Sequence, residues 1–112
     1  MAGISPTARS LKVLRSEGYT ADKVEYTVAY SYIKKDLFGC IDIVAVKEGT
    51  ILGVQATSSS NASARVKKSA ALPALRQWLL GGGLFEVWGW LKSKKSRRWE
   101  LRRIPVTVED LT

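Results

Sequence analysis

GCIDIVAVKEGTILGVQAT, residues 39–57, decides the fold of this 112-residue chain. Residues 39–46 form an apolar run that is typical of a buried strand, and residues 51–57 form a second such run. Lys47-Glu48-Gly49-Thr50 between them predicts a tight turn, because glycine adopts positive φ without steric cost. We therefore predict a β-hairpin whose first strand is apolar on both faces and central in a sheet.

The register of this hairpin carries the first functional hypothesis. A turn centred on Glu48-Gly49 places Asp42 opposite Gln55 and Cys40 opposite Thr57, with the Cβ atoms of each pair roughly 5 Å apart. Gln55 and Thr57 then share one face of the sheet. A carboxylate in an apolar strand is costly unless a charged or hydrogen-bonding group meets it. The partner of Asp42 is either a divalent metal ion or backbone amides at the strand end.

The spacing Gly39-x-x-Asp42, apolar run, turn, Gln55-x-Thr57 resembles the core of the PD-(D/E)XK nucleases. Within that superfamily it is most similar to small phage-type proteins that resemble Holliday-junction resolvases and VRR-NUC nucleases. The resemblance extends over residues 5–104. It implies an α/β fold with a mixed sheet flanked by helices, and an endonuclease that uses Mg²⁺ or Mn²⁺ on DNA, including branched or flapped DNA.

The resemblance also implies roles for individual residues. The family aspartate falls on Asp42, and the family (D/E)-x-K falls on Gln55-Ala56-Thr57, so Asp42 and Gln55 are the expected metal ligands. Glu17 is a further expected ligand, because a first-helix glutamate often joins the metal shell in the superfamily. Thr57 stands where the family has a catalytic lysine, and Gln55 where it has a carboxylate.

Some superfamily members supply the missing cation from the next helix, which makes Lys68 the expected catalytic lysine. Arg65 lies on the same helix face at i, i+3 spacing. A basic face that contacts only phosphates or water is the alternative. Glu25 and Asp36 are further carboxylates near the motif, although exposed surface positions are the simpler interpretation for both and for Glu17.

A rival hypothesis comes from the two departures from the family pattern. A hydrogen bond between Gln55 and Asp42, with no metal present, accounts for the two facing side chains as well as a metal site does. Since Thr57 has no charge, the chain is alternatively a catalytically inactive nuclease-fold DNA-binding module or an interaction subunit.

Composition narrows the remaining possibilities. The chain length fits one domain, with a core over residues 5–106. The sequence has no histidine, which excludes His-based nucleases, Ser-His-Asp hydrolysis and His-ligated zinc. A single cysteine, Cys40, excludes an internal disulfide. No apolar run is long enough to span a membrane and no signal pattern is present, so we expect a cytoplasmic protein, or for a phage protein the host cytoplasm.

The net charge is +8, and seven of the 18 basic residues lie between Lys92 and Arg103. Such a basic segment favours DNA as the partner, with a merely solvated hairpin tip as the alternative. A hydroxyl-rich turn before a helix is receptive to phosphate, or serves only as a helix cap. No membrane partner is expected, and a homodimer stays open. The expected nucleic-acid contacts are Thr57, Ser58, Ser59, Ser60, Asn61, Arg65, Lys67, Lys94, Lys95, Arg97 and Arg98.

The predicted element order is α-β-β-β-α-β-β. A helix begins at Ser5-Pro6 and ends at Gly18, and alternation predicts a strand over residues 24–32. After the hairpin, a helix begins near Ala62, and Pro73 kinks it or starts a second one. Residues 84–91 and 99–106 form a closing strand pair, and residues 107–112 are a loosely held tail. The four tryptophans are expected in the core or at an interface, with stacking on unpaired bases as the alternative.

Overall fold

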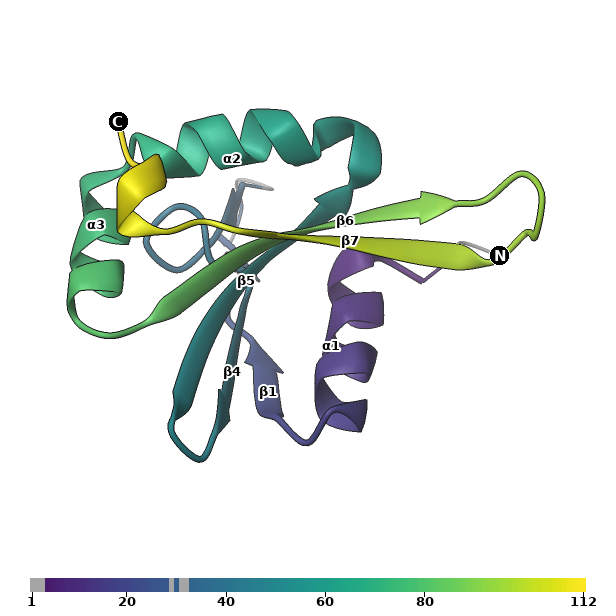
Figure 1. The fold of residues 1–112 in the computed structure, drawn as a ribbon, viewed down its shortest axis with the longest axis horizontal. Helices are drawn as coiled ribbons and strands as arrows, with labels where there is room; N and C mark the ends of the chain where they lie inside the picture. Colours follow the sequence, from purple (N-terminus) through teal and green to yellow (C-terminus); the bar gives the residue numbers. More distant parts are fainter. Residues whose placement is uncertain (1–3, 29, 31–32) are drawn as a thin grey trace.

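A mixed five-stranded sheet organises the computed structural model, which describes residues 4–28, 30 and 33–112 (Figure 1). The strand order is β1-β4-β5-β6-β7, with β5 and β6 parallel and the other neighbours antiparallel. Because β5 and β6 are parallel, the chain needs a long crossover between them, and two helices supply it. The strands of this sheet are β1 (Thr20–Lys23), β4 (Ile43–Lys47), β5 (Thr50–Ser58), β6 (Leu84–Lys92) and β7 (Trp99–Pro105).

Helices cover both faces of the sheet (Figure 1). Helix α1 (Pro6–Ser16) packs Leu14 against one core cluster that includes Trp88, while α2 (Ala62–Ala70) and α3 (Pro73–Leu80) pack against a second cluster. The molecule is therefore an α/β domain with a three-layer arrangement. Among the described residues, no helix is both long and apolar enough to cross a membrane.

The hairpin register predicted from residues 39–57 is confirmed where β4 and β5 pair, but this ladder ends before the predicted pairs Asp42–Gln55 and Cys40–Thr57. Strands β4 and β5 pair from Ile43↔Val54 to Lys47↔Thr50, and Gly49 has φ +77 at the turn. The predicted start of the first strand is wrong, because the ladder stops at Ile43. The backbone amide of Asp42 donates to the carbonyl of Val54 at 2.9 Å, and Leu37 bridges Ile41 across a tight turn.

The strand predicted over residues 24–32 is found only in part where it can be compared, and that part does not belong to the five-stranded sheet. The strand beside β4 is β1, in which Ala21 pairs with Ala45 and packs in the core. Part of the predicted strand forms β2 (Tyr26–Thr27), which pairs only with β3 (Lys34–Lys35) in a separate small sheet. Residues 29, 31 and 32 lie outside the described residues. The predicted element order is accordingly not reproduced over this part of the chain.

The helix boundaries follow the predicted stop and start residues. The Ser5 hydroxyl accepts a hydrogen bond from the Ala8 amide at 3.1 Å, and Gly18 follows α1 with φ +92. Pro73 begins a separate helix, so the alternative of a kink in one helix is excluded. Trp88 and Trp90 are buried, which confirms core packing for these two tryptophans.

The C-terminal segment is held more firmly than predicted. Thr107 and Asp110 exchange capping bonds around a single 3-10 turn, η2 (Val108–Asp110). Leu111 packs against the second core cluster, and the Thr112 amide donates to the carbonyl of Ala70 at 3.1 Å. The prediction of a loosely held tail is therefore wrong, because the acidic residues act as caps and one apolar side chain docks.

Candidate metal centre and nucleic-acid interface

Asp42 is a buried carboxylate at the point where the chain enters β4. Its side chain is only 5% exposed, and its Oδ2 atom accepts a hydrogen bond from the Ala56 amide at 2.9 Å. The prediction that backbone amides at the strand end bind Asp42 is thus confirmed for one amide, that of Ala56. Burial raises the pKa of Asp42 to about 7, with further contributions from the negative charges of Asp36 and Glu25. One amide therefore does not offset the cost of ionising this group.

Two more carboxylates converge on Asp42. Glu25, Asp36 and Asp42 each offer one oxygen, and these oxygens lie within 4.8 Å of one another. They come from the link between β1 and β2, the segment after β3, and the residue before β4. Glu25 and Asp36 are half-buried, so the interpretation of exposed surface positions is wrong for both. Hard oxygen ligands in this number suit Mg²⁺ or Mn²⁺.

The three carboxylates open into a cavity of about 670 Å³, here called the carboxylate cavity. The first turn of α1 forms one wall, and side chains of α2 form another. Glu25, Asp36 and Asp42 thus share the space with the positive end of a helix and with cations from α2. The charged and amide side chains that line the cavity are Lys23, Glu25, Asp36, Asp42, Gln55, Arg65 and Lys68.

Gln55 lines the same cavity as Asp42, as their predicted shared face requires. It is 4% exposed, and its Oε1 atom accepts a hydrogen bond from the Ser69 hydroxyl of α2 at 3.1 Å. The amide oxygen proposed as a metal ligand is therefore already engaged. Among the hydrogen bonds of the described residues, the partner of Gln55 is Ser69 and not Asp42.

The hydroxyl-rich turn lies between β5 and α2. Thr57 is 7% exposed, and Thr57 and Ser58 both line the carboxylate cavity. Within the described chain, neither Ser58 nor Asn61 makes a side-chain capping bond, so the capping interpretation is wrong for these two residues. The turn is seated on β6, since a Cβ atom at Gly89 would lie 3.1 Å from the Cα atom of Ser59.

The basic residues of α2 separate into two groups. Arg65 and Lys68 both line the carboxylate cavity, which agrees with their predicted common face. Lys67 is exposed and does not line it. Positive charges from α2 therefore lie beside the carboxylates.

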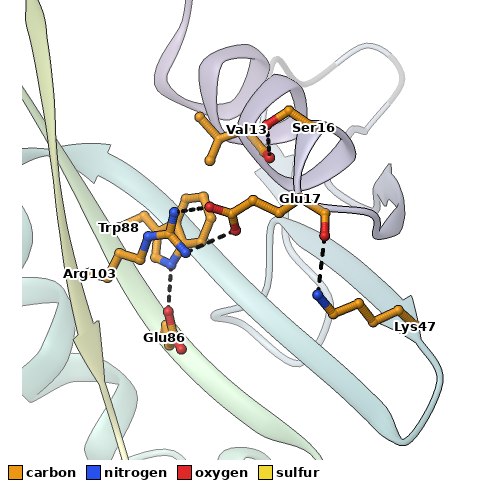
Figure 2. Close-up of polar contacts among 7 residues, drawn as sticks. All are labelled: Val13, Ser16, Glu17, Lys47, Glu86, Trp88 and Arg103. Carbon is orange, nitrogen blue, oxygen red and sulfur yellow. Dashed lines mark hydrogen bonds and ion pairs between the residues drawn. The ribbon is translucent and has the colours of Figure 1, made fainter.

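Glu17 lies elsewhere, at the C-terminal end of α1 (Figure 2). The Arg103 guanidinium donates to both carboxylate oxygens of Glu17 and stacks on the Trp88 ring, 4.5 Å from its centroid. The hydrogen bond from Arg103 holds the pKa of Glu17 below its usual range. Because the carboxylate cavity lies at the other end of this 11-residue helix, about 16 Å away, Glu17 is not part of the carboxylate cluster.

The basic segment predicted to contact DNA is the tip of the β6–β7 hairpin. Figure 1 shows this hairpin projecting past α1 and away from the body of the molecule. Ser93 and Arg98 close the tip through a backbone bond of 2.8 Å, and Arg97 has φ +57. All four predicted contact residues are exposed and take part in neither ion pair recorded for the described residues: Lys94, Lys95, Arg97 and Arg98.

Neither a protein-family model nor a curated protein matches this chain. The arrangement combines three carboxylates, three cations and a helix N-terminus in one cavity. The three cations are Lys23, Arg65 and Lys68. Sequence reasoning named Glu25 and Asp36 as carboxylates near the motif but did not predict that they converge on Asp42, because nothing in the pattern around Glu25 shows that the chain turns back toward Asp42.

Proposed function

We propose that this protein is a metal-dependent endonuclease that hydrolyses phosphodiester bonds in DNA, with Mg²⁺ or Mn²⁺ held by Glu25, Asp36 and Asp42. The observation that carries the proposal is the convergence of these three carboxylates, within 4.8 Å, in a cavity that also contains Arg65 and Lys68. Carboxylates for a metal beside cations for a phosphate are the combination that this hydrolysis needs.

The donor set fits a divalent cation. Three carboxylates repel one another, and burial makes the ionised form of Asp42 still more costly, as its pKa of about 7 reflects. A divalent ion offsets both effects and would favour the ionised form of all three groups. When bound, such an ion would supply Lewis-acid activation of water and charge neutralisation at the phosphate.

The remaining residues have distinct roles in the proposed reaction. The Ala56 amide orients the Asp42 carboxylate, and the Ser69 hydroxyl fixes the side chain of Gln55 against α2. Lys68 and Arg65 bind the phosphate and offset the negative charge that develops on it. Lys68 thereby takes the role of the lysine that Thr57 replaces.

The proposal includes the PD-(D/E)XK assignment and the resemblance to phage-type junction resolvases. It is supported by a hairpin that carries Asp42 and Gln55, followed by a helix that carries cations, in an α/β domain. The exposed β6–β7 tip would hold the DNA backbone without reading its sequence. Selectivity for branched or flapped DNA, and a homodimer that spans a junction, are parts of the same proposal.

A second candidate function is an inactive nuclease-fold module that binds DNA or serves as an interaction subunit. The observation that favours it is the loss of both family groups on β5. The oxygen of Gln55 is engaged by Ser69, and Thr57 supplies no charge. In this second candidate function the basic surface still binds DNA, and the carboxylate cluster has no catalytic role.

The two candidates are distinguished by a cleavage assay. Supercoiled plasmid, linear duplex, flapped and four-way-junction DNA are incubated with the wild-type protein in Mg²⁺ or Mn²⁺, beside Asp42→Asn. The nuclease proposal expects cleavage of at least one form by the wild type, and loss of that cleavage in Asp42→Asn with DNA binding retained. Binding of DNA without cleavage of any form would support the inactive module.

A further inference from the structure

Arg9 differs from the other arginines that contact α1. Arg15 donates to the carbonyl of Ala21 at 2.8 Å and pairs with Asp22, while Arg103 pairs with Glu17. These are the two ion pairs recorded within residues 4–28, 30 and 33–112. The Nε atom of Arg9 is shielded from solvent and has no hydrogen-bond partner in that same part of the chain. Arg9 is therefore a cation without an acidic partner.

The contact that positions Arg9 is an aromatic one. Its guanidinium carbon lies 3.9 Å from the ring centroid of Trp99, the first residue of β7. Stacking of this kind restrains the plane of the guanidinium without using its N–H groups. Because Nε is shielded from solvent, the terminal N–H groups of this restrained guanidinium are the donors suited to bind a phosphate. Trp99 itself is 43% exposed, so the pair lies at the surface.

Arg9 lies on the flank of α1 that faces away from the carboxylate cavity. Thr7 and Leu11 line the cavity, and each is about 200° around the helix from Arg9. Ser10, between these flanks, is buried and accepts a hydrogen bond from the Trp90 indole of β6 at 2.9 Å. Arg9 and the cavity are thus separated by the width of one helix, about 10 Å.

The surroundings of this pair are basic. Trp99 pairs with Lys92 across the β6–β7 ladder, and the next residue toward the tip is Arg98. A strand of nucleic acid held by the exposed tip would therefore reach the Arg9–Trp99 pair before it reaches the carboxylate cavity. The spacing of about 10 Å exceeds the rise of about 3.4 Å between successive phosphates of one strand. Arg9 would thus bind a phosphate other than the one being cut.

We infer that Arg9 and Trp99 form a phosphate-binding subsite for the backbone of a nucleic-acid strand, on the opposite side of α1 from the carboxylate cavity. The choice of nucleic acid as the ligand rests on the proposed function. The binding test below does not require the protein to cleave DNA. Arg9 is a binding and positioning residue, since it touches no reacting atom. Trp99 holds its guanidinium at the base of the basic hairpin.

The test measures binding of a fluorescein-labelled DNA duplex by anisotropy in buffer that contains EDTA, so that no cleavage takes place. Arg9→Ala should weaken binding by about tenfold or more, because it removes charge-assisted hydrogen bonds to a phosphate. It should also lower the slope of log affinity against log salt by about 0.9, the value for one phosphate. Arg9→Lys keeps the charge and should give an intermediate loss.

The matched control is Arg76→Ala, which removes one positive charge from an exposed position on α3, away from α1 and the hairpin. It should change the affinity by less than about twofold, since an exposed charge far from the bound strand acts only through screened electrostatics. Equal losses in Arg9→Ala and Arg76→Ala would overturn the inference. Thermal melting of each variant establishes that the fold is intact.

Tryptophan fluorescence gives a second readout that does not depend on the affinity. If DNA contacts the Arg9–Trp99 pair, the change in emission on adding unlabelled DNA should largely disappear in Trp99→Phe, which keeps an aromatic ring under Arg9. An undiminished change in Trp99→Phe would count against the subsite. Loss of DNA affinity in Arg9→Ala without cleavage by the wild type would support the subsite while the nuclease proposal fails.

Discussion

Asp42 combines two properties that both disfavour its ionised form: it is almost completely buried, and it belongs to a group of three carboxylates. One backbone amide, from Ala56, is its recorded hydrogen-bond donor. A folded-state pKa raised to about 7 means that the native protein holds a proton which the unfolded chain, with an aspartate pKa of about 3.9, releases. The stability contributed by this protonated group is therefore fully present below pH 4 and lost as the pH rises through 7.

The loss of stability as the pH rises leads to a prediction for the metal-free protein. Asp42→Asn keeps an oxygen for the Ala56 amide but has no proton to lose, so in EDTA at pH 8 it should unfold with a free energy about 2–4 kcal/mol higher than the wild type. The difference should shrink as the pH falls to 4. Urea denaturation at several pH values measures it, with the exposed Asp22→Asn as control. An Asp42→Asn protein that is less stable than the wild type at pH 8 would rule out a costly buried carboxylate.

At the scale of the element, the position of each cation on helix α2 decides whether its side chain reaches the carboxylate cavity. Lys67 and Lys68 are both exposed, but only Lys68 lines the carboxylate cavity. Two neighbouring lysines on one helix thus provide a comparison in which charge and helix propensity are nearly the same. Their effects on catalysis should differ because their side chains leave the helix about 100° apart.

Lys68→Ala should lower kcat by about a hundredfold, because it removes a charge that stabilises the phosphate as the bond breaks. Metal binding should be unaffected. Lys67→Ala should leave kcat unchanged and raise only KM. Steady-state cleavage of the preferred DNA form, together with a metal titration, measures each quantity. If the two variants reduce kcat equally, the assignment of Lys68 to the phosphate is incorrect.

The elements also show what could be predicted from the sequence. The hairpin register, the start of α3 at Pro73 and the stop after α1 at Gly18 follow from local rules of turns and caps, which the structure obeys. The strand predicted over residues 24–32 fails because its alternation does not correspond to burial. Tyr26 is 60% exposed, and the edge of the sheet is instead formed by β1, through one small buried residue, Ala21.

In the candidate site, too, features set by local spacing could be predicted and features set by tertiary structure could not. Asp42 and Gln55 could be brought together from the hairpin alone, and Arg65 with Lys68 from helical spacing. Glu25 could not be placed, because its position depends on a chain reversal between β1 and β4 that no local pattern specifies. Glu17 was expected from the superfamily, but here the chain uses it to pair with Arg103 across 86 residues.

At the scale of the whole molecule, a chain with net charge +8 holds three carboxylates in one cavity and places a basic hairpin outside it. The positive field would attract a polyanion, and the hairpin would give the largest number of contacts to it. The carboxylates repel phosphate unless a cation neutralises them. DNA affinity should therefore depend on the hairpin in the absence of metal.

Replacing Arg97 and Arg98 together with alanine should weaken DNA binding by a similar factor for unrelated sequences, since backbone contacts carry no sequence code. The slope of log affinity against log salt should fall by about 1–2, as expected for two lost phosphate contacts. Anisotropy titrations at several salt concentrations measure both. The charge-matched double variant Lys12→Ala/Arg76→Ala, elsewhere on the molecule, should change the slope less. Equal slopes in the two double variants would argue against the hairpin as the DNA contact.

The claim on which the function depends is that Glu25, Asp36 and Asp42 bind one divalent cation together. Calorimetric titration of Mn²⁺ into the metal-free protein at pH 8 tests it most directly. We predict saturable binding to the wild type, a loss of affinity of tenfold or more in each of Glu25→Gln, Asp36→Asn and Asp42→Asn, and no change in Asp22→Asn. Equal Mn²⁺ affinity in the wild type and in all three cavity variants would contradict the proposed metal centre.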